Sequence, residues 1–164
     1  MISTHIGDLY DILATNIDFV FFDGEEGEEG VPITPWSPIG SSYFADNISS
    51  LYKKELTQLA FVVDMVCDKD LSFYQEKNSM ASAPKETGDF WKFAHNLSPK
   101  TFVNTEKYAI LDDHTALQEV GIPSVLIIDF DYPFIYTQED SFDKCSPKSL
   151  ELVSNVLRAY IESL

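Results

Sequence analysis

Three stretches of the chain consist mainly of apolar residues and show no helical period. They are residues 17–23, 59–66 and 122–129. Short apolar runs that are rich in aromatic and β-branched residues are typical of strands buried on both faces of a sheet. The pattern therefore predicts three interior strands, with a short edge strand at residues 71–75.

Apolar residues at helical spacing predict helices between and around these strands. The predicted helices cover residues 3–14, a short segment that begins at 40–45, residues 85–97, residues 115–120 before Gly121, and 146–164. Strands that alternate with helices are typical of a parallel sheet. We therefore predict an α/β domain in which a mostly parallel sheet has helices on both faces.

Two of the predicted helices carry marked apolar faces. In the last helix, Ser146 can cap the N-terminus and Pro147 suits the first turn. Its predicted apolar face contains Leu150, Val153, Leu157, Ile161 and Leu164. The helix at 85–97 carries an aromatic stripe, which we expect to pack in the core rather than to bind a ligand: Phe90, Trp91, Ala94 and Leu97.

Charge limits the classes of partner. The formal net charge of −16 argues against nucleic acid and anionic membranes, since both are bound through clustered Lys and Arg. No signal peptide or membrane-spanning run is seen, so a cytoplasmic location is expected as encoded. Cys67 and Cys145 are too few and too irregularly spaced to predict a disulfide framework or a thiolate zinc site.

Acidic residues gather where the predicted strands end. Glu25 and Glu26 follow the first strand, Asp64 ends the second, and Asp112 and Asp113 precede the helix before the third. A single acid at such a place is usually a cap or a turn residue, and an acidic loop is usually solvated. Several carboxylates at comparable strand ends raise one another's pKa and favour a metal or proton-transfer site.

Six segments in order resemble peptidase family M28, a family of zinc peptidases, and most closely its glutaminyl-cyclase-like branch. They are residues 21–26 (Phe-Phe-Asp-Gly-Glu-Glu), 40–45, 63–66 (Val-Asp-Met-Val), 111–114 (Leu-Asp-Asp-His), 121–133 and 139–146. The resemblance implies a three-layer zinc-peptidase fold, with residues 1–164 as one partial domain that lacks the N-terminal strands of the family.

The resemblance also implies roles for the acids. Glu25 would be the general base or acid and Glu26 a zinc ligand. Asp64 would bind a second zinc in a two-metal aminopeptidase, or join the proton network in a one-metal cyclase. Asp113, or Asp112 if the register differs by one, would support Glu25, although either could instead cap the helix at His114.

Two departures from the family pattern affect the expected zinc site. Tyr136 stands where the family has a zinc-binding His, and the ligands that the family carries before the Glu-Glu pair are not among these residues. A catalytic zinc usually needs three protein ligands, and a phenol must lose a proton to become one. His5, His95 and His114 show no metal-binding spacing with one another. Asp68 and Asp70 resemble the start of a calcium loop, but the later ligands of such a loop are missing.

Two hypotheses follow. In the first, the chain is a homologue of zinc-dependent aminopeptidases or glutaminyl-peptide cyclotransferases, acts on peptides if active, and is inactive as this isolated chain. In the second, it is a non-catalytic binding or structural module. Both hypotheses are compatible with a homo-oligomer or with a complementing N-terminal segment, because exposed sheet edges favour association. Relatives in the family are often secreted or periplasmic, which leaves the location open.

Overall fold

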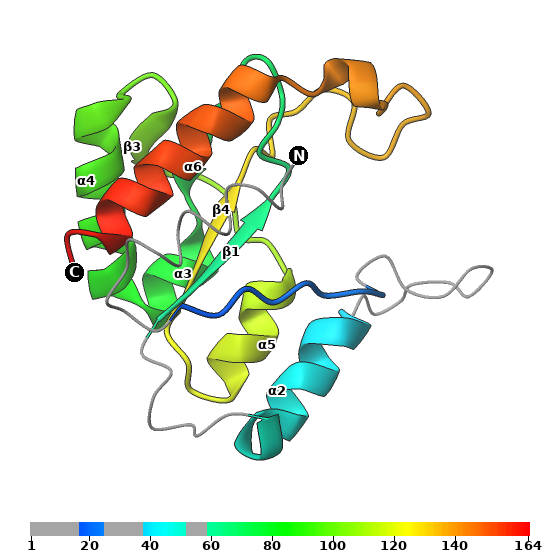
Figure 1. The fold of residues 1–164 in the computed structure, drawn as a ribbon, viewed down its shortest axis with the longest axis vertical. Coiled ribbons are helices and arrows are strands. Elements are labelled where there is room, and N and C mark those ends of the chain that lie inside the picture. Colours follow the sequence, from blue (N-terminus) through cyan, green and yellow to red (C-terminus); the bar gives the residue numbers. More distant parts are fainter. Residues whose placement is uncertain (1–16, 25–37, 52–58) are drawn as a thin grey trace.

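The computed structural model describes residues 17–24, 38–51 and 59–164, and in these residues strands and helices alternate as predicted (Figure 1). The predicted helix at 3–14 lies outside them. The described elements are α2 (Ile39–Leu51), β1 (Ala60–Asp64), β2 (Phe73–Gln75), α3 (Lys77–Ser82), α4 (Pro84–Leu97), β3 (Phe102–Glu106), α5 (Asp113–Glu119), β4 (Ser124–Ile128), the 3₁₀ helix η2 (Phe142–Lys144) and α6 (Pro147–Ile161). The α/β prediction is confirmed, whereas α3 and β3 had not been predicted.

The strands pair in parallel, as predicted, but in two pairs. β1 lies beside β4, with Ala60 opposite Ser124 and Asp64 opposite Ile128. β2 pairs with β3. A side chain of α3 also bonds to the backbone of β4, because Leu126 N donates to Ser79 Oγ at 3.1 Å.

Helices cover both faces of β4, the most deeply buried strand. Val125 and Ile127 pack in a cluster with the aromatic residues of α4 and with α6. Leu126 and Ile128 point the other way and pack with Ile110. A third cluster joins α2, α5 and β1. Alternate residues of one strand therefore serve opposite layers, which gives the expected three-layer arrangement.

The last helix begins as predicted but buries a different face. The Ser146 side chain accepts a hydrogen bond from Ser149 N, and Pro147 occupies the first turn. The buried residues of α6 are Ser149, Val153, Val156 and Tyr160. Leu150 and Leu164 are exposed, so only Val153 of the predicted face is fully buried. Tyr160 turns the buried face toward α4, where its ring packs against Phe90 and Phe93.

Three other predictions on burial were wrong. Residues 17–23 form no strand, and Phe21 is 79% exposed. A continuous apolar run becomes a buried strand only where neighbouring strands satisfy its backbone, and no described strand pairs with it. Val63 of β1 is 42% exposed, because β1 has a described partner on one side only. Leu97 is exposed at the end of α4, whereas Phe90, Trp91 and Ala94 are buried as predicted.

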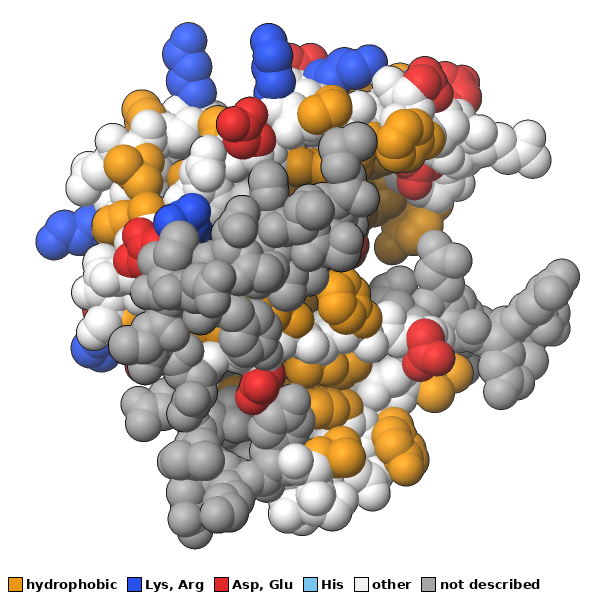
Figure 2. Space-filling model, in the orientation of Figure 1, with side chains coloured by type: hydrophobic (Ala, Val, Ile, Leu, Met, Phe, Trp, Pro, Cys, Tyr) orange, Lys and Arg blue, Asp and Glu red, His pale blue; other side chains and the backbone are white. Residues whose placement is uncertain are grey.

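Hydrophobic side chains are visible on the face formed by α2 and α5 (Figure 2). The exposed apolar residues of α2 are Ile39, Tyr43 and Leu51, and Leu111 is exposed just before α5. No described helix is both long and apolar enough to cross a bilayer.

Candidate active site

The start of α2 fixes the chain immediately before the Glu25–Glu26 pair. Glu25 and Glu26 themselves lie outside the described residues. Gly24, the residue before them, has a φ of +64°, and its carbonyl oxygen accepts a hydrogen bond from Ile39 N at 3.2 Å. A left-handed backbone favours glycine, so this residue suits the turn that leads into the acid pair.

Gly40 allows this close approach. A Cβ built at Gly40 would lie 2.9 Å from Asp23 N and closer still to Asp23 O, so the backbone of Asp23 occupies the space that a side chain would need. The rings of Phe22 and Phe44 pack edge to face beside this contact, with centroids 5.5 Å apart. The Gly-Ser-x-x-Phe-Ala segment at 40–45 thus holds the end of the run at 17–24 against α2.

Asp113 lies beside the same turn of α2. Burial raises the pKa of the Asp113 carboxyl, while the nearby Ser41 hydroxyl and His114 lower it and compensate only in part. Ser41 is fully buried. Within the described part of the chain, Ser41 Oγ and Asp113 Oδ1 have no hydrogen bond of ordinary geometry. A half-buried carboxyl with a raised pKa is suited to hold or exchange a proton.

Asp112 takes the capping role that the sequence had left open between two adjacent acids. It is the N-cap residue of α5, and its carboxylate accepts the hydrogen bond of Asp113 N. Thr115 N and Oγ1 both donate to the Asp112 carbonyl. This geometry leaves the Asp113 side chain to face α2, although its support of Glu25 stays a prediction.

A buried pair that had not been predicted stands behind these acids. Glu76 is 1% exposed, and its Oε2 lies 3.1 Å from Nε2 of His114, which is fully buried. The Glu76 carboxylate also accepts hydrogen bonds from the backbone of Asn78, Ser79 and Ile110. Burial raises the pKa of Glu76, but these hydrogen bonds outweigh it and hold the pKa below its usual range. The sequence signal was an acid three residues before Ser79, which suits a helix cap.

His114 therefore helps to order its loop. Its Nδ1 is buried and has no hydrogen-bond partner among the described residues. Through Glu76 it connects the first turn of α5 to α3 and to the segment at Ile110. The pair fixes the position of the turn that carries Asp112 and Asp113.

Asp64 ends β1 in a strained turn. Its Oδ1 accepts a hydrogen bond from Met65 N at 2.8 Å, and Met65 has a φ of +49°. Positive φ at a residue other than glycine costs free energy and is concentrated at functional sites. Asp64 is the last residue of β1, so it lies at the strand end as predicted.

Tyr136, the residue at the expected His position, points into solvent. Its side chain is 93% exposed, and its φ is +59°. It belongs to the segment between β4 and α6. In the described residues, no three His, Cys, Asp or Glu side chains are grouped as a metal site. These residues alone do not fit a zinc ion.

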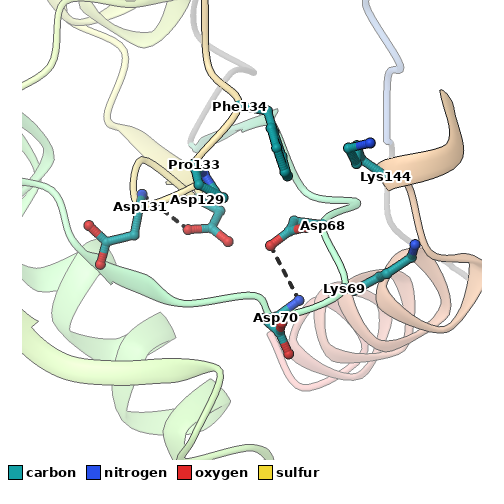
Figure 3. Close-up of a pocket in the computed structure, with 8 residues that line it drawn as sticks. All are labelled: Asp68, Lys69, Asp70, Asp129, Asp131, Pro133, Phe134 and Lys144. Atoms are coloured by element: carbon teal, nitrogen blue, oxygen red, sulfur yellow. Dashed lines mark hydrogen bonds between the residues drawn. The ribbon is translucent and has the colours of Figure 1, made fainter. Parts of the chain in front are cut away.

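An acidic hollow lies where β4 ends. It has a volume of about 340 Å³ and is lined by Asp68, Lys69, Asp70, Asp129, Asp131, Pro133, Phe134 and Lys144 (Figure 3). Asp129 accepts hydrogen bonds from Ser72 N and Asp131 N, and burial raises its pKa to about 6. The sequence placed Asp129 at a strand end, but the site prediction did not include it.

Comparisons with known proteins give a consistent result. The chain matches the model of peptidase family M28 over residues 9–161. No curated protein sequence matches it. Among solved structures, it is similar to a glutaminyl cyclase from Fimbriiglobus ruber, with 32% identity over 86% of this chain and 50% of that chain, at a TM-score of 0.74.

Two further structures resemble it. One is a Zn-dependent exopeptidase from Parabacteroides distasonis, with 26% identity over 88% of this chain and 53% of that chain, at a TM-score of 0.77. The other is a glutaminyl cyclase from Tannerella forsythia, with 27% identity over 88% and 53%, at a TM-score of 0.73. The chain therefore spans about half the length of the structures that it resembles.

Proposed function

The chain belongs to peptidase family M28, and from that premise we propose that it carries the proton-transfer part of the family's site without a complete zinc site. Glu25 would carry the proton and Glu26 would be a metal ligand. The chain alone would then have neither aminopeptidase nor glutaminyl cyclase activity, and its substrates in a complete site would be peptides.

The observation that supports this proposal is the position of Asp113. Asp113 has a raised pKa and lies near Ser41 in the first turn of α2. Ile39, in the same turn, donates a hydrogen bond to Gly24, the residue before Glu25. A protonatable group at that place suits support of a general base. The cap formed by Asp112 and the buried pair of Glu76 and His114 would hold this group in place.

The choice between the two activities depends on the metal count, to which Asp64 is central. Known structures similar to this chain include both an exopeptidase and glutaminyl cyclases. The higher identity to the Fimbriiglobus ruber glutaminyl cyclase favours a one-metal ancestry, in which Asp64 would belong to the hydrogen-bond network. The exposed Tyr136 supports the view that the zinc site is incomplete in this chain.

Zinc binding tests the proposal directly. The purified chain is equilibrated with zinc, and bound metal is measured by elemental analysis alongside Tyr136→His and Phe142→His. We expect no stoichiometric zinc in the unchanged chain. Tyr136→His should raise zinc affinity about tenfold or more, since even residues behind the ligands change it by that factor. Phe142→His adds an imidazole to an equally exposed residue of the same segment and should not.

Three results would contradict the proposal. Stoichiometric zinc in the unchanged chain would show that the metal site is complete, and equal gains in both variants would separate residue 136 from the site. Turnover is measured in parallel with a fluorogenic aminoacyl substrate and an N-terminal Gln peptide, and turnover by the unchanged chain would contradict its proposed inactivity. In that case, loss of turnover in Glu25→Gln with metal retained would assign the proton role to Glu25, and unchanged turnover would reject that role.

The exposed apolar residues of α2, which are Ile39, Tyr43 and Leu51, favour a second candidate function, a non-catalytic binding module. A binding module needs no metal and would keep its partner after Glu25→Gln. Zinc binding and turnover after Tyr136→His would favour the enzyme homologue, and their absence would favour the binding module.

A further inference from the structure

The two cysteines, 78 positions apart in the sequence, lie side by side in the fold. Cys67 follows β1, and Cys145 stands between η2 and α6. An isolated antiparallel bridge joins Asp68 to Cys145. The adjacent backbone groups are hydrogen bonded, with Ser146 N donating to Cys67 O at 2.6 Å.

The two thiols affect each other electrostatically. Cys67 and Cys145 are both free and half-buried, and Cys145 is among the neighbours that raise the pKa of the Cys67 thiol. The bridge pairs Cys145 with Asp68, the direct neighbour of Cys67, and the hydrogen bond from Ser146 to Cys67 lies beside it. The two cysteines are therefore one position out of register across the bridge, and a bond between the sulfurs requires both side chains to orient toward each other.

We propose that Cys67 and Cys145 are a redox pair that closes to an intramolecular disulfide in the folded chain. Each thiol loses one hydrogen and one S–S bond forms. The two electrons and two protons pass to a disulfide oxidant such as oxidised glutathione, whose own S–S bond breaks to give two thiols. Reduction by a dithiol reverses the reaction.

The surroundings of Cys67 favour the disulfide over the two free thiols. Burial, then Cys145, Asp140 and Asp68, raise the pKa of the Cys67 thiol to about 12. Disulfides are readily reduced where the protein stabilises the thiolate that reduction releases. Here the protein disfavours that thiolate, so the disulfide should resist reduction once formed, and exchange should be slow.

The disulfide would connect the two segments that line the acidic hollow. Asp68, Lys69 and Asp70 line one side from the segment after β1, and Lys144 lines another from η2 (Figure 3). At present these two segments are joined by the bridge at Cys145 and by Lys69 Nζ, which donates to Asp143 O at 2.9 Å. A disulfide would add a covalent link to these contacts. It would also fix the C-terminal end of the segment between β4 and α6, which is the segment that carries Tyr136.

The test uses the full chain after reduction and removal of the reductant. The chain is incubated with excess oxidised glutathione at mildly alkaline pH, then alkylated and analysed by mass spectrometry. We expect a monomer whose mass is lower by two hydrogens, no alkylated cysteine, and a linked peptide pair that contains Cys67 and Cys145. The Tm should rise by roughly 5–15 °C, since the bond closes a long loop of the unfolded chain.

Matched variants make each outcome decisive. Cys67→Ser and Cys145→Ser each keep one thiol and should show no Tm increase under the same treatment. The proposal is overturned if both thiols of the unchanged chain stay alkylatable, or if only intermolecular disulfides form. A stable glutathione adduct without closure, or a Tm that falls on oxidation, would overturn it equally. None of these readouts depends on zinc or on turnover.

Discussion

A single buried carboxylate connects three segments that are distant in the sequence. The Glu76 carboxylate accepts hydrogen bonds from the first turn of α3 and from the backbone of Ile110, and it pairs with the ring of His114. Each of these groups would be left buried without a partner if the carboxylate were lost. Such orphaned polar groups are costly, which makes Glu76 a determinant of the position of Asp113.

We predict that Glu76→Gln lowers the free energy of unfolding by about 2–4 kcal/mol at pH 7. The amide keeps the size of the side chain but cannot accept all of the hydrogen bonds that the carboxylate accepts. Urea unfolding measures the loss. Glu119→Gln, at an exposed position of α5, is the control and should change stability by less than about 0.5 kcal/mol.

The pH dependence of this difference has a defined sign. The pKa of Glu76 is lowered in the folded chain, so its contribution is present above the unfolded pKa and is lost as pH falls through the folded pKa. The gap between the unchanged chain and Glu76→Gln should therefore narrow below about pH 4. A gap that widens in acid would contradict the lowered pKa.

Asp129 should behave in the opposite way. Its pKa is raised to about 6 by burial, with Asp68 and Asp131 adding repulsion that hydrogen bonds from Ser72 and Asp131 only partly offset. Its stabilising contribution is fully present below the unfolded pKa and is lost as pH rises through about 6. Between about pH 4 and pH 7 the unchanged chain should lose about 2–3 kcal/mol relative to Asp129→Asn.

Unfolding curves for the two proteins at several pH values measure this difference. A relative stability that does not change with pH would mean that Asp129 is ionised in the folded chain as in the unfolded one. The acidic hollow would then be more strongly solvated than the burial of Asp129 indicates, since that side chain is 1% exposed.

Adjacent acids show the limit of prediction at the scale of residues. The Asp-Asp-His segment located the correct turn, but a sequence cannot tell which of two neighbouring carboxylates caps a helix. That choice depends on backbone geometry: Asp112 has the extended φ and ψ of a cap, while Asp113 begins α5. The partner of His114 was not predicted for a similar reason, because Glu76 is 38 residues away.

At the scale of elements, two glycines in helices should respond oppositely to the same substitution. Gly40→Ala places a Cβ against the backbone of Asp23 and should displace the end of the run at 17–24, lowering stability by about 1–3 kcal/mol. Gly88→Ala in α4 meets nothing within 4 Å and should stabilise by about 0.5–1 kcal/mol.

Urea unfolding measures both changes, and backbone NMR shifts report whether residues 17–24 move. If Gly40→Ala were as harmless as Gly88→Ala, the close approach of Asp23 to α2 would be wrong. The position of the Glu25–Glu26 pair relative to Asp113 would then lose its support.

Comparison of two apolar runs explains why some strands were predicted correctly. Residues 122–129 and 17–23 have the same continuous pattern, yet only the first contains a buried strand, β4. β4 has β1 on one side and the Ser79 side chain on the other, with helices on both faces. Composition indicates that a segment is apolar, whereas burial depends on which neighbours lie beside it. The polar strand β3 was missed because its last residues are exposed.

At the scale of the whole molecule, the exposed apolar surface favours association. Phe19, Val20 and Phe21 are exposed, and β1 has no second partner strand among the described residues. An unpaired strand edge with apolar side chains is a template for pairing with another chain. We therefore predict dimers or larger species in solution, and a monomer in small-angle X-ray scattering across a concentration series would contradict this.

Substitution of one residue can locate the contact. Val63 lies in β1 and is 42% exposed, so Val63→Lys places a charge on the unpaired strand and should shift the scattering mass toward the monomer. Leu97→Lys is the matched control, because Leu97 is 56% exposed and lies at the end of α4, outside β1. If both variants dissociated equally, the effect would not be specific to β1, and the contact would not be placed there. Dissociation by Val63→Lys alone would place the contact at β1, beside Asp64, where a complementing segment would also have to bind.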